Sequence, residues 1–276
     1  MKYVDLDGFT RGTFTHQSAT HNVYRRGSGP AVIVIAEMPG ITPRVLEFAT
    51  RVAEIGCTVV VPHLFGTPGR DPNPKHVGWV SGLTYTAKSF AYTCISREFT
   101  TLATGKSSPV VNWLRALAAE EHERCGGPGV GAVGMCFTGG YALSMAVDER
   151  LLVPVLAQPA MPLALTKSRS RSLDISPEDL AVVKDRCANN GLEVIGLRFR
   201  GDRLSPPGRF DFLREQLGES FIGVELDDDD ASPESPVPAH HTVTEHLVDR
   251  PGAPTRQALD MVLDHLRRRL LDGSAA

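Results

Sequence analysis

The sequence predicts an α/β fold, with one mostly parallel, doubly wound sheet and helices on both faces. Six short runs rich in Val and Ile alternate with helical patterns, an order that implies right-handed crossovers between neighbouring parallel strands. The runs are apolar almost throughout, as expected for strands buried on both faces. A chain of 276 residues with 42% hydrophobic content can bury one large core. We therefore expect a single domain.

The expected strands share β-branched composition and glycine, proline or polar residues at their ends. In chain order they are 31–36, 57–61, 130–135, 152–156, 192–199 and 221–226. Residues 1–30 are expected to form an N-terminal segment that packs on the core built by residues 31–276.

The expected helices begin with capping residues or proline. Thr42 is a suitable N-cap, Pro43 fits the first helical position, and Gly56 follows the predicted end. In chain order the helices are 43–55, 109–121, 138–147, 177–189, 207–217 and 254–271. Residues 66–108 break this rhythm, because they are long, aromatic in places and weakly periodic. Long connections in compact domains are usually functional, so this segment is predicted to be a cap that faces the substrate.

Composition narrows the classes of partner. The net charge is −3, with 29 basic and 32 acidic residues well mixed, so no basic stripe for nucleic acid is present. No apolar run approaches the roughly 18 residues that a membrane span requires, and the N-terminus has no apolar signal core. Five cysteines without a C-x-x-C pair favour reduced thiols over disulfides or a zinc site. We expect a cytoplasmic monomer or homodimer that binds neither nucleic acid nor membrane.

The glycine-rich stretch 130–140 is the strongest functional signal. A predicted strand runs directly into a predicted helix, and Cys136 stands at the turn between them. In α/β-hydrolases such a turn is a nucleophile elbow, which exposes the nucleophile above the sheet. Two other interpretations compete: a buried cysteine that acts as a small hydrophobe, and a dinucleotide-binding glycine turn. The second lacks the G-x-G-x-x-G spacing and the acidic residue that should follow roughly 20 residues later.

A nucleophile of this kind needs an acid and a histidine later in the chain. Asp202 follows the predicted strand 192–199 and a glycine, although a turn aspartate is the ordinary alternative. His240 and His241 follow the next strand, and only one of them can be the base. We favour His240 and keep His241 as the fallback.

These residues resemble the dienelactone hydrolase family of α/β-hydrolases. The resemblance rests on the elbow sequence Gly-Met-Cys-Phe-Thr-Gly-Gly at 134–140, on Gly201-Asp202, on His240, and on Glu37 after the first predicted strand. It extends from about residue 31 to the end of the chain.

The resemblance implies a triad of Cys136, Asp202 and His240. It also implies that Glu37 helps to deprotonate the thiol when substrate arrives, and that the backbone N–H groups of Met38 and Phe137 form the oxyanion hole. A carboxylate next to a thiol raises the pKa of that thiol, which would protect the resting nucleophile.

The chain departs from the family pattern at two positions, Thr138 and Thr244. Thr138 stands where glycine usually follows the cysteine by two residues. Arg97 is a candidate for the first of two arginines that bind the substrate carboxylate in the family, whereas Thr244 stands where the second is expected.

The predicted function is hydrolysis of a carboxylic ester or lactone through a thioester on Cys136, with a small-molecule substrate and no metal or organic cofactor. Two alternatives remain open. One is a thiol-based redox or sensor protein, and the other is a non-catalytic binding module on a hydrolase scaffold.

Overall fold

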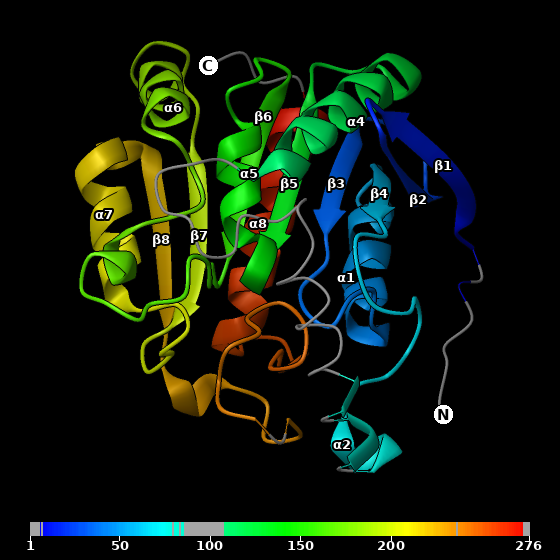
Figure 1. The fold of residues 1–276 in the computed structure, drawn as a ribbon, viewed down its shortest axis with the longest axis vertical. Coiled ribbons are helices and arrows are strands. Elements are labelled where there is room, and N and C mark those ends of the chain that lie inside the picture. The colour runs from blue at the N-terminus through cyan, green and yellow to red at the C-terminus, as the bar shows by residue number, and fades with distance from the viewer. Residues whose placement is uncertain are drawn as a thin grey trace.

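A computed structural model describes residues 6, 8–78, 80–82, 84–85, 108–235 and 237–272. These residues form an eight-stranded sheet in the order β1-β2-β4-β3-β5-β6-β7-β8 (Figure 1). The strands are β1 (Thr10–His16), β2 (Ala19–Arg26), β3 (Ala31–Ile35), β4 (Thr58–Pro62), β5 (Val130–Met135), β6 (Leu151–Ala157), β7 (Val194–Phe199) and β8 (Phe221–Leu226). The pairings from β4 to β8 are parallel, and β2 is antiparallel to both β1 and β4. The α/β architecture with a mostly parallel sheet is confirmed.

The described helices cover both faces of the sheet. They are α1 (Pro43–Glu54), α2 (Pro74–Val77), α4 (Pro109–Cys125), α5 (Gly139–Met145), α6 (Pro177–Asn189), α7 (Pro207–Leu217) and α8 (Pro254–Leu270). Side chains from α4, α5, α6 and α7 build the core on one face, and those from α1 and α8 build the core on the other (Figure 1). Strands β3 and β4 are fully buried, as their continuous apolar sequence predicts.

The start of α1 follows the predicted capping chemistry. Thr42 has an extended backbone, its hydroxyl accepts a hydrogen bond from the N–H of Val45 at 3.2 Å, and Pro43 begins the helix. The helix expected at 138–147 instead divides into a short 3-10 turn, η1 (Cys136–Thr138), and α5.

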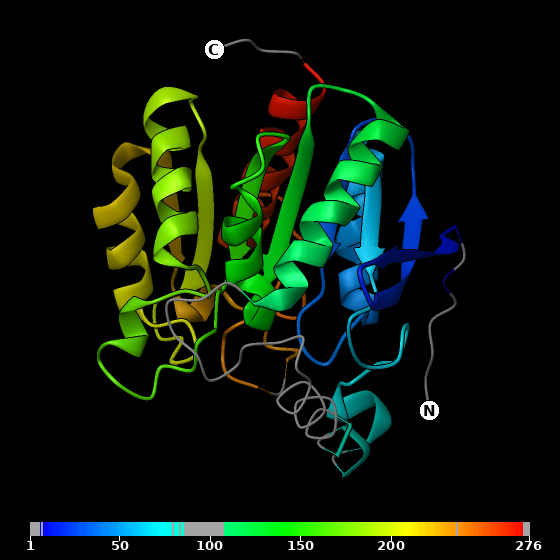
Figure 2. The ribbon, with the colours of Figure 1, turned by 45° about the horizontal axis from the view of Figure 1, so that its top comes forward.

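The N-terminal segment contributes two strands that the sequence analysis did not predict. β1 and β2 pair in register from Thr10 opposite Arg25 to His16 opposite Ala19, and β2 joins the main sheet through β4. Figure 2 shows this pair at one side of the sheet and β8 with α7 at the other. The strands were missed because they are mostly polar, with Phe14, Val23 and Tyr24 as their buried hydrophobic residues.

The connection predicted as a cap lies mostly outside the described residues. Residues 86–107, and with them Arg97, are not described. In the described part of the connection, the phenol oxygen of Tyr85 accepts a hydrogen bond from the N–H of Thr67 at 2.8 Å. Across the described ranges, no helix has the length and apolar character that crossing a membrane would need.

Candidate active site

The turn predicted to be a nucleophile elbow lies at the carboxyl end of β5. Cys136 has a φ of 50°, in the left-handed region that L-residues rarely adopt. A Cβ on Gly134 would lie 2.3 Å from the carbonyl oxygen of Thr138, so only glycine allows this close approach of strand and turn. The hydroxyl of Thr138 accepts from the N–H of Met135 at 3.0 Å and donates to the carbonyl of Ile35 at 2.8 Å. Thr138, at the position of the family's usual glycine, thus ties the turn to β3 and β5.

Some groups around the sulfur of Cys136 raise the pKa of the thiol, and others lower it. The residue is partly buried, and burial is the largest cause that raises the pKa of its thiol above the usual value, followed by the charges of Glu37 and Asp202. The backbone N–H groups of Phe137 and Met38 bond to the sulfur and lower its pKa, but they do not outweigh the other causes. The resting residue is therefore a thiol at neutral pH.

Asp202 and His240 form a buried pair. Nδ1 of His240 lies 2.6 Å from Oδ2 of Asp202, and Oδ1 of Asp202 accepts from the N–H groups of Leu204 and Ser205. Burial raises the pKa of Asp202, but the hydrogen bond and charge of His240, with these N–H groups, hold it below its usual value. Asp202 is therefore ionised and orients the imidazole.

The other ring nitrogen of His240 is available for proton transfer. Nε2 is buried and has no hydrogen-bond partner within the described ranges. If Nδ1 carries the proton toward Asp202, Nε2 is the basic nitrogen of the neutral ring.

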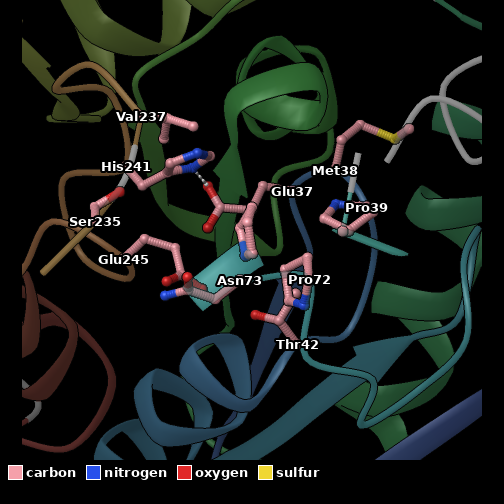
Figure 3. Close-up of a pocket in the computed structure, with 12 residues that line it drawn as sticks. Glu37, Met38, Pro39, Thr42, Pro72, Asn73, Ser235, Val237, His241 and Glu245 are labelled. Atoms are coloured by element: carbon pink, nitrogen blue, oxygen red, sulfur yellow. Dashed lines mark hydrogen bonds and ion pairs between the residues drawn. The ribbon is translucent and has the colours of Figure 1, made fainter. Parts of the chain in front are cut away.

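Glu37 lies two residues beyond β3 and is held by three donors. Its Oε2 lies 2.6 Å from Nδ1 of His241 and 2.9 Å from Nε2 of Gln158, and its Oε1 accepts from the hydroxyl of Thr244. Burial raises the pKa of Glu37, but His241 and Thr244 outweigh burial and lower it. Burial lowers the pKa of His241, and Glu37 raises it above its usual value. The two side chains therefore form an ion pair (Figure 3).

Gln158 is a functional-site residue that the sequence analysis missed. It follows β6 directly with a φ of 37°, and its Oε1 accepts from both the N–H and the hydroxyl of Thr242. Gln158 thereby connects the end of β6 to Glu37 and to the histidine loop. Its position after a predicted strand, at the edge where parallel strands end, was the signal that could have identified it.

His246 binds the backbone of both histidines. Its Nδ1 accepts from the N–H of His241 at 3.0 Å and of His240 at 3.4 Å, and its Nε2 bonds to the carbonyl of Val237. The ring also stacks on His241 at 5.5 Å. Burial lowers the pKa of His246 to about 4, so the ring is neutral and keeps this pattern at neutral pH. No signal in the sequence distinguished it from an ordinary loop histidine.

Two cavities meet at Val237 and His241, which line both. The smaller, of about 160 Å³, includes Glu37 and Met38 in its wall (Figure 3). The larger, of about 530 Å³, is lined by Asp202 and His240. Substrate groups could therefore be held on either side of His241.

The structure thus places the predicted residues at one edge of the sheet, with Arg97 as the exception because it lies outside the described ranges. The backbone N–H groups of Met38 and Phe137 contact Cys136, and Glu37 acts on it electrostatically. His240 contacts Asp202, whereas His241, the fallback base, contacts Glu37. Within the described residues, no group of three or more His, Cys, Asp or Glu side chains is arranged to hold a metal ion.

Comparison with known proteins matches the chain to one family. The sequence profile of the dienelactone hydrolase family matches residues 19–161, more than half of the 276-residue chain. None of the curated proteins compared with the chain matches it.

Similar solved structures share the fold at low sequence identity. They include dienelactone hydrolase from Anabaena variabilis, with 15% identity, a TM-score of 0.52, and coverage of 95% of this chain and 98% of that one. A dienelactone hydrolase-like promiscuous phosphotriesterase from metagenomic libraries has 13% identity and a TM-score of 0.55, covering 95% of this chain and 98% of that one. A 2,6-dihydroxy-pseudo-oxynicotine hydrolase has 17% identity and a TM-score of 0.56, covering 97% of this chain and 70% of that one.

Proposed function

The chain belongs to the dienelactone hydrolase family and is an ester or lactone hydrolase, and we propose that it acts through a thioester on Cys136. The observation that carries this proposal is the buried His240–Asp202 pair. Nε2 of His240 has no hydrogen-bond partner among the described residues, and it shares the edge of the sheet with Cys136, whose backbone is left-handed. This combination supplies a nucleophile, a base and a group that orients the base.

The proposed reaction begins with proton transfer from the Cys136 thiol to Nε2 of His240. The thiolate attacks the carbonyl carbon of the ester, and the carbonyl oxygen takes up the negative charge. The N–H groups of Met38 and Phe137 stabilise that oxyanion. The carbon–oxygen bond then breaks, and the alcohol leaves with the proton from His240. Water, deprotonated by the same nitrogen, releases the acid from the thioester and restores the thiol.

The two oxyanion donors have a different partner in the resting enzyme. Both N–H groups bond to the sulfur of Cys136, so a substrate oxygen can use them only after the thiol has turned away. This movement would bring the sulfur out of contact with the donors when a carbonyl group enters. The resting arrangement therefore supports a nucleophile that is protected until substrate binds.

The role of Glu37 in deprotonating the thiol depends on the hydrogen-bond donors around its carboxylate. His241, Gln158 and Thr244 donate to its oxygens, and the contacts with His241 and Thr244 lower the pKa of Glu37. A carboxylate stabilised in its charged form in this way is a weak acceptor for the thiol proton. In the resting state its charge opposes formation of the thiolate. We therefore assign the base in the chemical step to His240.

Hydrolysis of p-nitrophenyl butyrate tests the proposal. Cys136→Ala is expected to lower kcat/KM by about 10³-fold or more, as loss of a nucleophile does in other hydrolases. Cys125→Ala, at the end of α4, is the matched control and should retain activity. A thioester trapped on Cys136 and detected by mass spectrometry would locate the intermediate. Unchanged hydrolysis by Cys136→Ala would refute the nucleophile.

A further inference from the structure

The smaller cavity begins beside the reacting sulfur. Met38 lines its wall, and the backbone N–H of the same residue bonds to the sulfur of Cys136. Much of the rest of the wall is apolar, with Pro39, Pro72 and Val237 among its residues (Figure 3). Its volume of about 160 Å³ is below the roughly 300–1,000 Å³ of cavities that enclose a whole drug-sized ligand. It fits one substituent of a substrate whose carbonyl lies at the elbow.

Three ionisable side chains of the described residues line this cavity: Glu37, His241 and Glu245. The first two neutralise each other as an ion pair with 2.6 Å between Oε2 and Nδ1. The oxygens of Glu37 are also satisfied by Gln158 and Thr244. Of the three side chains, Glu245 therefore carries the negative charge that has no counter-charge within the cavity wall.

Glu245 has no hydrogen-bond or ion-pair partner in the part of the chain that the structure describes, although it is partly buried. His241 and Arg44 are the basic side chains that act on it electrostatically. His241 is already paired with Glu37. The guanidinium of Arg44 bonds to Glu47 at 2.9 Å and pairs with Glu234 at 3.6 Å. Glu245 lines the same cavity as Glu37 and His241 (Figure 3). A carboxylate in a mostly apolar wall is stabilised by a donor, and most strongly by a charged one.

We propose that this cavity receives a protonated amine of the substrate, which donates to the carboxylate of Glu245. This inference rests on the proposed function and refines it, because it assigns the substrate class: an ester or lactone that carries an ammonium group a few bonds from the reacting carbonyl. A substrate with a carboxylate at that position would meet Glu245 and Glu37 and would be disfavoured.

Pairs of esters that differ in one group test the substrate class. 2-(Dimethylamino)ethyl butanoate and 3-methylbutyl butanoate place N–H⁺ or C–H at the same position on the alcohol side. Ethyl 4-(dimethylamino)butanoate and ethyl 5-methylhexanoate do so on the acyl side. The cavity receives one side of the substrate, so the effect is expected in one of the two pairs. In that pair, kcat/KM for the cationic ester should exceed kcat/KM for its neutral partner by about 10- to 100-fold, the range for a hydrogen bond to a charged group.

Two variants assign this ratio to one side chain. Glu245→Gln should bring the cationic-to-neutral ratio close to one. Glu234→Gln changes a neighbouring carboxylate whose side chain is 78% exposed and does not line the cavity, and it should keep the ratio of the parent protein. A ratio near one in the parent protein for both pairs, or an unchanged ratio in Glu245→Gln, would overturn the inference.

Binding separates failure of the inference from failure of the proposed function. By calorimetry, 2-(dimethylamino)ethanol should bind the parent protein more tightly than 3-methylbutan-1-ol, and Glu245→Gln should remove the difference. If the protein hydrolyses p-nitrophenyl butyrate but shows no preference for the amine, the substrate class is wrong and the thioester mechanism stands. If it hydrolyses no ester at all, the mechanism fails, and the two alcohols still decide whether the cavity selects an amine.

Discussion

Cys136 lies close enough to Glu37 for the charge of the carboxylate to raise the pKa of the thiol. A non-glycine residue in the left-handed region costs about 1–3 kcal/mol, which the fold must offset elsewhere. The thiol that this conformation presents is held protonated by burial and by the charges of Glu37 and Asp202. Its reactivity is thus set by its neighbours rather than by the cysteine itself.

Replacing Glu37 by glutamine should lower the pKa of the Cys136 thiol, because one of the two negative charges that raise it is removed. The pKa should stay above that of an exposed cysteine, since burial is the larger cause. The pH dependence of alkylation by iodoacetamide, followed at the Cys136 peptide by mass spectrometry, measures the change. Glu47→Gln, on the exposed part of α1, is the control. An unchanged or raised pKa in Glu37→Gln would contradict the assignment.

His241→Asn should destabilise the protein in a defined pH window. The pKa of His241 is raised from 6.5, so its contribution is complete below 6.5 and is lost as pH rises through the raised value. The pKa of Glu37 is lowered from 4.5, so its contribution is complete above 4.5 and is lost as pH falls through the lowered value. The loss of stability should therefore be greatest between pH 4.5 and 6.5.

Urea unfolding at pH 5.5 and pH 9.5 measures this dependence. At pH 5.5 the loss should be about 1–3 kcal/mol, because a buried carboxylate loses a partner, and it should be smaller at pH 9.5. His76→Asn is the control: the His76–Asp71 pair has the same kind of contact at 2.7 Å, but the histidine side chain is 48% exposed, so little change is expected. Equal losses for His241→Asn at both pH values would show that charge is not the cause.

The elbow depends on close approach between β5 and the turn that follows. Gly134→Ala should destabilise the protein by about 1–3 kcal/mol, because its Cβ would overlap the carbonyl of Thr138 and the backbone must shift. Activity should fall more than stability, since the same shift moves Cys136. Thermal unfolding and hydrolysis of p-nitrophenyl butyrate measure the two effects.

Gly12→Ala in β1 is the matched control for this substitution. The added Cβ there would meet the guanidinium of Arg25, at the flexible end of a side chain. Both stability and activity should stay close to those of the parent protein. If Gly134→Ala behaved like Gly12→Ala, the close approach at the elbow would not be required.

The loop between β8 and α8 brings the histidines to the elbow. His240 and His241 are neighbours in sequence, yet they contact carboxylates that follow different strands, β7 and β3. His246 holds the backbone of both residues in place by accepting hydrogen bonds from their N–H groups. The loop therefore acts as a single unit that positions two imidazoles.

At the scale of the whole molecule, a side-chain contact as well as the backbone pairing of β2 with β4 connects the antiparallel strands β1 and β2 to the rest of the fold. Arg25 on β2 donates to Glu121 on α4 with 2.7 Å between Nε and Oε1, and Arg124 binds the other carboxylate oxygen. The side chain of Glu121 is fully buried. This contact joins residues 96 positions apart in the chain.

Glu121→Ala should cost about 1–3 kcal/mol of unfolding free energy, because two charge-assisted contacts to a buried carboxylate are lost while Arg25 and Arg124 both reach solvent. Urea unfolding measures the loss, and Glu120→Ala, the exposed neighbour on α4, is the control. Catalysis should persist in the folded fraction, since Glu121 lies outside the site. A loss below that of Glu120→Ala would show that the contact contributes nothing to stability.

The sequence by itself determined the alternation of strands and helices, the cysteine at the turn after β5, and the chain order of the proposed nucleophile, acid and histidine. These features are local, because periodicity, capping and turn glycines act over a few residues. That order selected Asp202 and His240 as candidates, and the two side chains are in contact in the structure; their catalytic roles stay a prediction.

Tertiary structure alone decided which side chains meet across the edge of the sheet. Glu37 contacts His241 and Thr244, more than 200 residues away, and Gln158 completes the contact from a third strand. The polar strands β1 and β2 likewise became recognisable only in the structure, where β1 pairs with β2 and β2 pairs with β4. Such contacts depend on how several loops fold together over parallel strand ends, and no local pattern in the chain encodes that geometry.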